Sequence, residues 1–209
     1  VSKLLLRQEL ESALTLLCLF PCHSRRMAEL KLQALIDLKR YEEAESQASL
    51  MLSEDPNCAV TREKRMMCRR KMGRKIEELT DKLFLLERIG ADPQRLHNTY
   101  LIRGSRYLRA KMYDEAAEDV KIAEQHLPQS ADSLALRGKL AFEYGDYHDA
   151  IGYLTCSLDY DDSTRRFSLT SVLTERSLAQ QKVGRYEPAL ADLDRAMTLE
   201  VSAELKAWL

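Results

Sequence analysis

The sequence has little of what marks an enzyme, a secreted domain or a membrane protein. Seven glycines and five prolines are few for 209 residues, and no glycine cluster forms a phosphate-binding loop. The five cysteines are scattered, odd in number and without a Cys-x-x-Cys pair, so we interpret them as reduced thiols. The longest apolar run, from Ala13 to Phe20, is far shorter than the roughly 20 residues of a membrane span. With a net charge of −1, no overall excess attracts nucleic acid or a membrane surface.

Alanine, leucine, glutamate, lysine and arginine are abundant, which is typical of a helix-rich protein and predicts an all-α fold. Reduced cysteines favour a cytoplasmic or nuclear protein over a secreted one. The chain begins at Val1 without a methionine and stops inside a helical pattern at Leu209, as expected of a fragment of a longer protein.

One short pattern recurs along the chain. Four tyrosines follow a turn, and each is followed three residues later by an alanine: Tyr41 and Ala44, Tyr113 and Ala116, Tyr147 and Ala150, Tyr186 and Ala189. Counting back sixteen residues from each tyrosine starts the units at 25, 97, 131 and 170, and the middle two starts are 34 residues apart. The chain is therefore expected to be a helical repeat array.

Small residues recur where two helices of a unit must touch. They are Gly104, Gly138 and Ser177 at position 8, and Ala123, Ser157 and Ala196 at position 27. A larger side chain at these positions would force the helix axes apart. Pro56 and Pro128 occupy position 32, where a proline ends the second helix.

These residues resemble the tetratricopeptide repeat family, and unit 97–130 fits best. It carries Tyr100, Gly104, Tyr107, Tyr113, Ala116, Val120, Ala123 and Pro128 at signature positions. The resemblance implies a right-handed superhelical α-solenoid of antiparallel helix pairs, whose first helices line a concave groove.

The units divide the chain into seven segments. Segment 59–96 is interpreted as a degenerate, basic repeat because Lys75 and Glu78 replace the tyrosine and alanine. The predicted order is a flanking helix in 1–24, repeats in 25–58, 59–96, 97–130, 131–164 and 165–203, and the start of a further helix in 204–209. The 165–203 repeat carries a short insertion, 165–169, and the 131–164 repeat lacks the terminal proline.

No arrangement of residues predicts catalysis, a metal site or a cofactor. The histidines His23, His97, His126 and His148 are spread over different units, and we expect them to be exposed or to cap helices. Cys18, Cys22 and His23 resemble half of a zinc site, but no fourth ligand is evident. Paired acids lie in helix first turns or inter-repeat turns, where they complement the helix dipole. The chain is therefore predicted not to be an enzyme.

The resemblance places a partner along the groove, at positions 2, 5, 9, 12 and 13 of each first helix. The predicted contact residues are Asn98, Ser105, Arg109, Lys139, Phe142, Thr174, Gln181 and Lys182. The lysine and asparagine clamp with which family members capture a chaperone's acidic C-terminus is absent, since Leu101, Ser105 and Leu178 stand at three of its positions. The expected function is protein binding, as a co-chaperone or complex-assembly adaptor without that clamp, with an extended or acidic segment as partner.

A strongly basic block offers an alternative site. It consists of Arg62, Arg65, Arg69, Arg70, Lys71, Arg74 and Lys75. Such a block could recognise nucleic acid, an acidic protein or a nuclear import receptor; equally, it could be a solvated helix face with Met66, Met67, Cys68 and Met72 turned inward. Because unit 131–164 is rich in acids, head-to-tail self-association is a further hypothesis.

Overall fold

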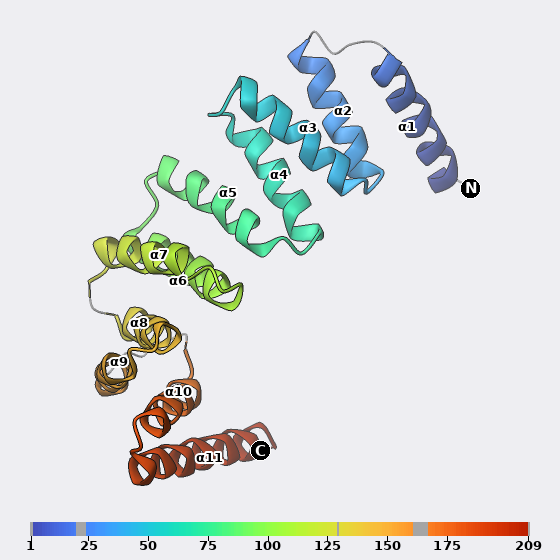
Figure 1. The fold of residues 1–209 in the computed structure, drawn as a ribbon. Coiled ribbons are helices and arrows are strands. Elements are labelled where there is room, and N and C mark those ends of the chain that lie inside the picture. Colours follow the sequence, from blue (N-terminus) through green and yellow to red (C-terminus); the bar gives the residue numbers. More distant parts are fainter. Residues whose placement is uncertain (1, 20–23, 129, 161–166, 209) are drawn as a thin grey trace. The chain divides into compact units, whose positions relative to one another are not determined.

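The computed structural model describes residues 2–19, 24–128, 130–160 and 167–208, which form eleven helices and no strand (Figure 1). The all-α prediction is confirmed. The helices are α1 (Ser2–Leu19), α2 (Arg25–Asp37), α3 (Tyr41–Glu54), α4 (Ala59–Lys71), α5 (Lys75–Arg88), α6 (Pro93–Arg109), α7 (Tyr113–His126), α8 (Ala131–Tyr144), α9 (Tyr147–Asp159), α10 (Leu169–Lys182) and α11 (Tyr186–Trp208). No helix in these ranges has the length and apolar character needed to cross a bilayer.

The helices pack as successive pairs within two units, residues 1–91 and 92–209. In the first unit, α1 packs on α2, and the pairs α2/α3 and α4/α5 contact each other through α3 and α4. In the second unit, the pairs are α6/α7, α8/α9 and α10/α11, and they contact each other through α7 with α8 and α9 with α10. Each unit therefore buries its core between neighbours in sequence, as expected of a repeat array.

The same turn joins the two helices of every pair. One residue of each turn has a positive φ, namely Lys39 (60°), Gly73 (75°), Lys111 (60°), Gly145 (89°) and Gly184 (77°). The next backbone N–H donates to the carbonyl five residues earlier, as from Asp146 to Ala141 at 2.8 Å. This arrangement ends a helix with a left-handed residue, which glycine adopts most easily. Because the α4/α5 turn is of this kind, the 59–96 segment keeps the local geometry of the others although it has lost the tyrosine.

Small residues lie at the predicted helix contacts. A Cβ atom on Gly138 would lie 2.5 Å from Cγ of Leu154, and one on Gly104 would lie 3.3 Å from Cβ of Asp119. The other predicted small residues, Ser177, Ala123, Ser157 and Ala196, are all buried. The packing interpretation of these positions is therefore confirmed.

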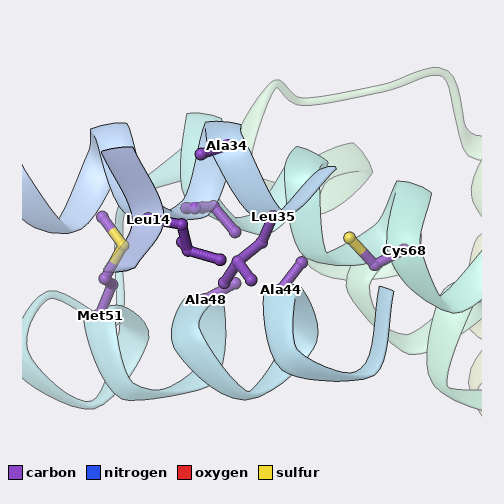
Figure 2. Close-up of a cluster of buried hydrophobic side chains, with 8 residues drawn as sticks. Leu14, Ala34, Leu35, Ala44, Ala48, Met51 and Cys68 are labelled. Carbon is purple, nitrogen blue, oxygen red and sulfur yellow. The ribbon is translucent and has the colours of Figure 1, made fainter. Parts of the chain in front are cut away.

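The apolar core of the first unit is built from four helices. Leu14 of α1 meets Leu32, Ala34 and Leu35 of α2, together with Ala44, Ala48 and Met51 of α3 and Cys68 of α4 (Figure 2). Ala44 and Ala48 are fully buried, so α2 approaches the backbone of α3 closely. The thiol of Cys68 belongs to this core, and burial raises the pKa of Cys68.

The structure changes two predicted boundaries. Helix α6 begins at Pro93, so the predicted boundary at 97 falls one turn inside it; Asp92 and Pro93 provide the start, because proline fits the first helical position. Helix α11 continues to Trp208, so the prediction of a new helix in 204–209 is wrong for the described residues of that range. No glycine or proline follows Pro188, and nothing in the sequence interrupts the helix. Residues 165 and 166 of the predicted insertion, like Pro21, lie outside the described residues, and the last residue of the insertion, Leu169, begins α10.

Candidate functional site

The first helices of the second unit, α6, α8 and α10, form one surface, because α6 contacts α8 and α8 contacts α10. We call it the first-helix surface. All eight predicted groove residues lie on these helices. Arg109, Gln181 and Lys182 are exposed, whereas Asn98, Ser105, Lys139, Phe142 and Thr174 are half-buried.

Several predicted contact residues already have partners within the fold. Nζ of Lys139 lies 3.1 Å from Oε1 of Glu175, and it donates to Oγ of Ser171 at 3.1 Å. The hydroxyl of Thr174 donates to the carbonyl of Thr170 one turn earlier, at 2.8 Å. The positive charge of Lys139 is therefore largely compensated, and this residue joins α8 to α10.

A pocket of about 210 Å³ opens on the first-helix surface. Its lining residues are Leu101, Ile102, Ser105, Arg106, Arg109, Asp132 and Phe167, and we call it the α6 pocket. Of these, Ser105 and Arg109 were predicted as contact residues from the sequence. Helix α6 supplies five of the seven residues, at the helical spacings that place side chains on one face.

The aromatic wall of the pocket comes from a residue outside any helix. Phe167 precedes α10, and its backbone N–H donates to Oδ1 of Asp132 in the first turn of α8, at 3.0 Å. Its ring packs against the cluster of Ala135, Leu154 and Val172, and Nζ of Lys139 lies 5.1 Å from the ring centre. The segment before α10 is thus tied to α8, which holds Phe167 beside α6.

Two arginines at the edge of the α6 pocket have no ion pair with any described residue. Arg106 and Arg109 are both exposed, and they lie three residues apart on one face of α6. No described residue forms an ion pair with either of them. The pocket therefore combines an apolar floor with a cationic rim.

A buried arginine–aspartate pair recurs in three helix pairs. Position 7 of the repeat, in the first helix, carries the arginine, and position 23, in the second helix, carries the aspartate. In each pair Nε and Nη2 of the arginine donate to the two carboxylate oxygens. The pairs are Arg65 with Asp81, Arg103 with Asp119, and Arg176 with Asp192, each with a shortest N–O distance of 2.6 Å. We did not predict these pairs, although the spacing of 16 residues between arginine and aspartate was a signal that could have found them.

Asp81 binds three arginines of the basic block at once. Its carboxylate is fully buried and accepts hydrogen bonds from Arg62, Arg65 and Arg69, whose side chains are 12–15% exposed. Arg69 also pairs with Glu45, and the guanidinium of Arg62 stacks on the ring of Phe84 at 3.6 Å. These three residues of the predicted basic patch are therefore part of the packing between α4 and α5, rather than a solvated face.

The rest of the basic patch is more exposed and partly paired. Arg70 and Lys75 both bind Glu78, and Arg74 binds Glu45. Burial disfavours the charged form of Glu78, but the hydrogen bonds from Arg70 and Lys75 outweigh it and lower the pKa of Glu78 below its ordinary value of 4.5. Lys71 is exposed, and no described residue forms an ion pair with it.

The expectation that the histidines would be exposed or cap helices is wrong for His97, which is buried between α6, α7 and α8. Its Nδ1 lies 2.9 Å from the carbonyl oxygen of Ala123, and its Nε2 lies 2.9 Å from Oγ of Ser130. Because a carbonyl only accepts, Nδ1 carries a proton. Ser130 is the N-cap of α8, so this contact fastens the start of α8 to the preceding pair. His126 is half-buried and stacks on Tyr100, and His148 is exposed.

Within the described part of the chain, no three His, Cys, Asp or Glu residues gather to hold a metal ion. The half-site considered at Cys18, Cys22 and His23 lies outside the described side chains. One cysteine has an unusual environment, since Sγ of Cys58 lies 3.1 Å from the hydroxyl of Thr61 and accepts from Arg25 at 3.2 Å. The hydrogen bond with Thr61, followed by the charge of Arg25, lowers the pKa of Cys58 below 9.0 although burial opposes this.

A row of apolar side chains is exposed on α11. It consists of Tyr186, Leu190, Leu193 and Met197, which are 39–64% exposed. In α9 the residues at the same repeat positions include Leu154 and Leu158, which pack in the cluster that contains Val172 of α10. In the α8/α9 pair, the equivalent face of α9 is covered by α10, the first helix of the next pair. The exposed row on α11 is the corresponding face of the α10/α11 pair.

Comparison with solved structures finds similar folds at low sequence identity. MamA has a TM-score of 0.54 and 20% identity, over 83% of this chain and 96% of that one. A chain of the APC/C hetero-tetramer Cut9–Hcn1 has a TM-score of 0.51 and 15% identity, and the match covers 93% of this chain but only 37% of that one. TTC0263, a thermophilic TPR protein of Thermus thermophilus, has a TM-score of 0.48 and 20% identity, over 85% and 96% of the two chains. No family model matches the sequence, and a comparison with curated proteins gives no match.

Proposed function

We propose that this chain, which has the tetratricopeptide repeat fold, is a non-enzymatic interaction module that binds an extended segment of another protein along its first-helix surface. The α6 pocket carries this proposal, because it joins apolar walls to two exposed arginines that pair with no described residue, on the surface where contacts were predicted. Buried apolar anchors beside arginines are typical of protein-binding sites.

The role that follows is that of an adaptor or scaffold in a complex. The absence of the lysine and asparagine clamp argues against a receptor for acidic chaperone C-termini, so a co-chaperone role would need another mode of contact. One of the similar structures is a hetero-tetramer of two different proteins, Cut9 and Hcn1, which is consistent with an assembly role.

We assign the basic block, Arg62 to Lys75, to the packing of the first unit rather than to nucleic-acid binding. Three of the seven are held by Asp81, and three more bind Glu45 or Glu78. A nucleic-acid site needs several cations free to contact phosphates. In this block, Lys71 alone is exposed and without a described partner.

Site-specific photo-crosslinking tests the proposal. The full chain would carry a photoreactive residue at Ser105 in the α6 pocket, at Glu118 on the exposed side of α7, or at Lys71 on α4. We expect protein adducts from cell extract at Ser105 but not at Glu118. Adducts that form only at Lys71, and that nuclease or raised salt removes, would show that the basic helix is the site and refute the proposal.

A further inference from the structure

We infer that the α6 pocket takes one aliphatic or aromatic side chain of the bound segment, and that Arg106 and Arg109 bind acidic residues next to that anchor. This inference rests on the proposed function and specifies its partner. The recognised segment is thus an extended acidic peptide with one large apolar residue, rather than an acidic tail alone.

The size of the pocket sets the size of its occupant. Small-molecule and cofactor sites usually measure about 300–1,000 Å³, whereas the α6 pocket measures about 210 Å³. This space suits a single leucine, methionine or phenylalanine side chain. Leu101 is 2% exposed and forms the floor, while Ile102 and Phe167 are half-buried walls with apolar surface still open to an occupant.

The charges around the pocket determine the sign of the charge that a partner must carry. Arg106 and Arg109 lie on one face of α6, one turn apart, so both guanidinium groups reach the same side of the bound segment. Asp132 is the single acid of the lining; it is buried, it accepts from the backbone of Phe167, and it lies in the first turn of α8, where the helix dipole favours its charge. The outward-facing charge is therefore positive, and it favours carboxylates, to which arginine can donate two parallel hydrogen bonds.

The two features together predict a spacing in the partner. An extended chain rises about 3.3 Å per residue and directs alternate side chains to the same side. With the anchor in the pocket, the residues two positions before and after it face α6 as well. An aspartate or glutamate at one of these positions is within reach of the arginines at the rim.

Fluorescence anisotropy with synthetic peptides tests this. The probes are fluorescein-labelled eleven-residue peptides with leucine or alanine at the centre, flanked at two positions on each side by glutamate or by lysine. We expect the leucine peptide with glutamates to bind the full chain at least 10-fold more tightly than the alanine peptide with glutamates or the leucine peptide with lysines. Equal affinity for leucine and alanine, or for glutamate and lysine, would overturn the inference, as would absence of binding by every peptide.

Protein variants locate the contact. The double variant Arg106→Glu with Arg109→Glu should weaken binding of the acidic leucine peptide at least 10-fold and remove most of its salt dependence. Both side chains are exposed and form no ion pair with a described residue, so the far-UV circular dichroism should not change. Arg95→Glu is the matched control, since this exposed arginine of α6 is not part of the pocket, and it should leave the affinity within 2-fold. Ser105→Leu should reduce binding of the leucine peptide by filling the pocket while leaving the arginines in place.

Other occupants give different results. Tighter binding of a single-stranded RNA oligonucleotide that depends on Arg106 and Arg109 would overturn the inference. So would concentration-dependent dimerisation in sedimentation that the double variant abolishes, because the occupant would then be a second copy. If Ser105 crosslinks a protein partner while peptide binding shows no preference for an apolar anchor or for acids, the proposed function stands and this inference alone fails.

Discussion

Substitution of Asp81 by asparagine removes the charge that holds three buried arginines together. In the native fold the carboxylate accepts from Arg65 at 2.6 and 3.1 Å, from Arg69 at 2.9 Å and from Arg62 at 3.2 Å. The asparagine has nearly the same size and keeps one acceptor oxygen. It loses the negative charge, however, and turns an amide N–H₂ group toward guanidinium donors.

The expected loss of stability is large because the arginines cannot move into water without opening the helix pair. Their side chains are 12–15% exposed, and Asp81 is fully buried. Removing one partner of a buried ion pair costs about 3–5 kcal/mol. Arg69 keeps Glu45, and Arg62 keeps the carbonyl of Pro56, so we expect the lower end, about 3 kcal/mol, rather than a multiple of it.

Urea unfolding and hydrogen exchange of the full chain measure this effect. With a slope of about 1–3 kcal/mol per molar urea, the midpoint of the first unit should fall by about 1–3 M. Faster exchange should be confined to α4, α5 and α3, and should leave α10 and α11 unchanged, because α3 to α5 belong to a separate packing unit. Glu118→Gln, in an exposed pair with Lys121, is the control and should change stability by less than about 0.5 kcal/mol. A loss below about 1 kcal/mol for Asp81→Asn would refute the assignment of the basic block to packing.

Three further substitutions test the packing, turn and charge arguments, each with urea unfolding as the measurement. Gly138→Ala should destabilise the second unit by about 1–3 kcal/mol, because the added Cβ has no room. Gly152→Ala is the control: no atom lies within 4 Å of a Cβ at this position, and the substitution should stabilise the unit by about 0.5–1 kcal/mol. Lys111→Gly should stabilise by about 0.5–1 kcal/mol, because φ is 60° there, whereas Lys121→Gly within α7 should cost about 1 kcal/mol. Because the pKa of Glu78 is lowered in the folded state, its contribution to the free energy of unfolding is present above pH 4.5 and is lost as the pH falls through the folded pKa. The stability difference between wild type and Glu78→Gln should therefore shrink below pH 4.5. A difference that grows in acid would contradict the pairing of Glu78 with Arg70 and Lys75.

The fold could be predicted well because its main signals are local and periodic. The tyrosine and alanine spacing located the second helices, and the positions of Gly104 and Gly138 followed from the need of two helix axes to approach. The helix ends were predicted less well. The extra turn of α6 from Pro93 was missed, because counting back from Tyr113 assumed a first helix of fixed length, while the start signal at Asp92 and Pro93 lay outside that count.

The candidate site could be predicted only in part, because the α6 pocket joins residues far apart in the sequence. Ser105 and Arg109 followed from their repeat positions. Phe167 did not, since it lies outside every helix and reaches the pocket through the hydrogen bond from its backbone N–H to Asp132. The burial of His97 was not predicted for a related reason, since it depends on contact with Ser130, 33 residues later in the sequence.

The basic block shows why charge counted along the sequence misleads in a repeat of this kind. An arginine at position 7 meets an aspartate 16 residues later in the second helix. The arginines of α4 are therefore paired with acids of the neighbouring helices α5 and α3, and not with their neighbours in sequence. Where the aspartate is missing the arginine finds other partners: Arg137 pairs with Glu124 and lies over the ring of Tyr153, which takes the place of the aspartate. Six of the seven residues of the basic block are paired in this way. Lys71 is the one residue of the block without an ion pair to any described residue. The same count leaves Arg106 and Arg109 at the edge of the α6 pocket, where their charge is open to a partner.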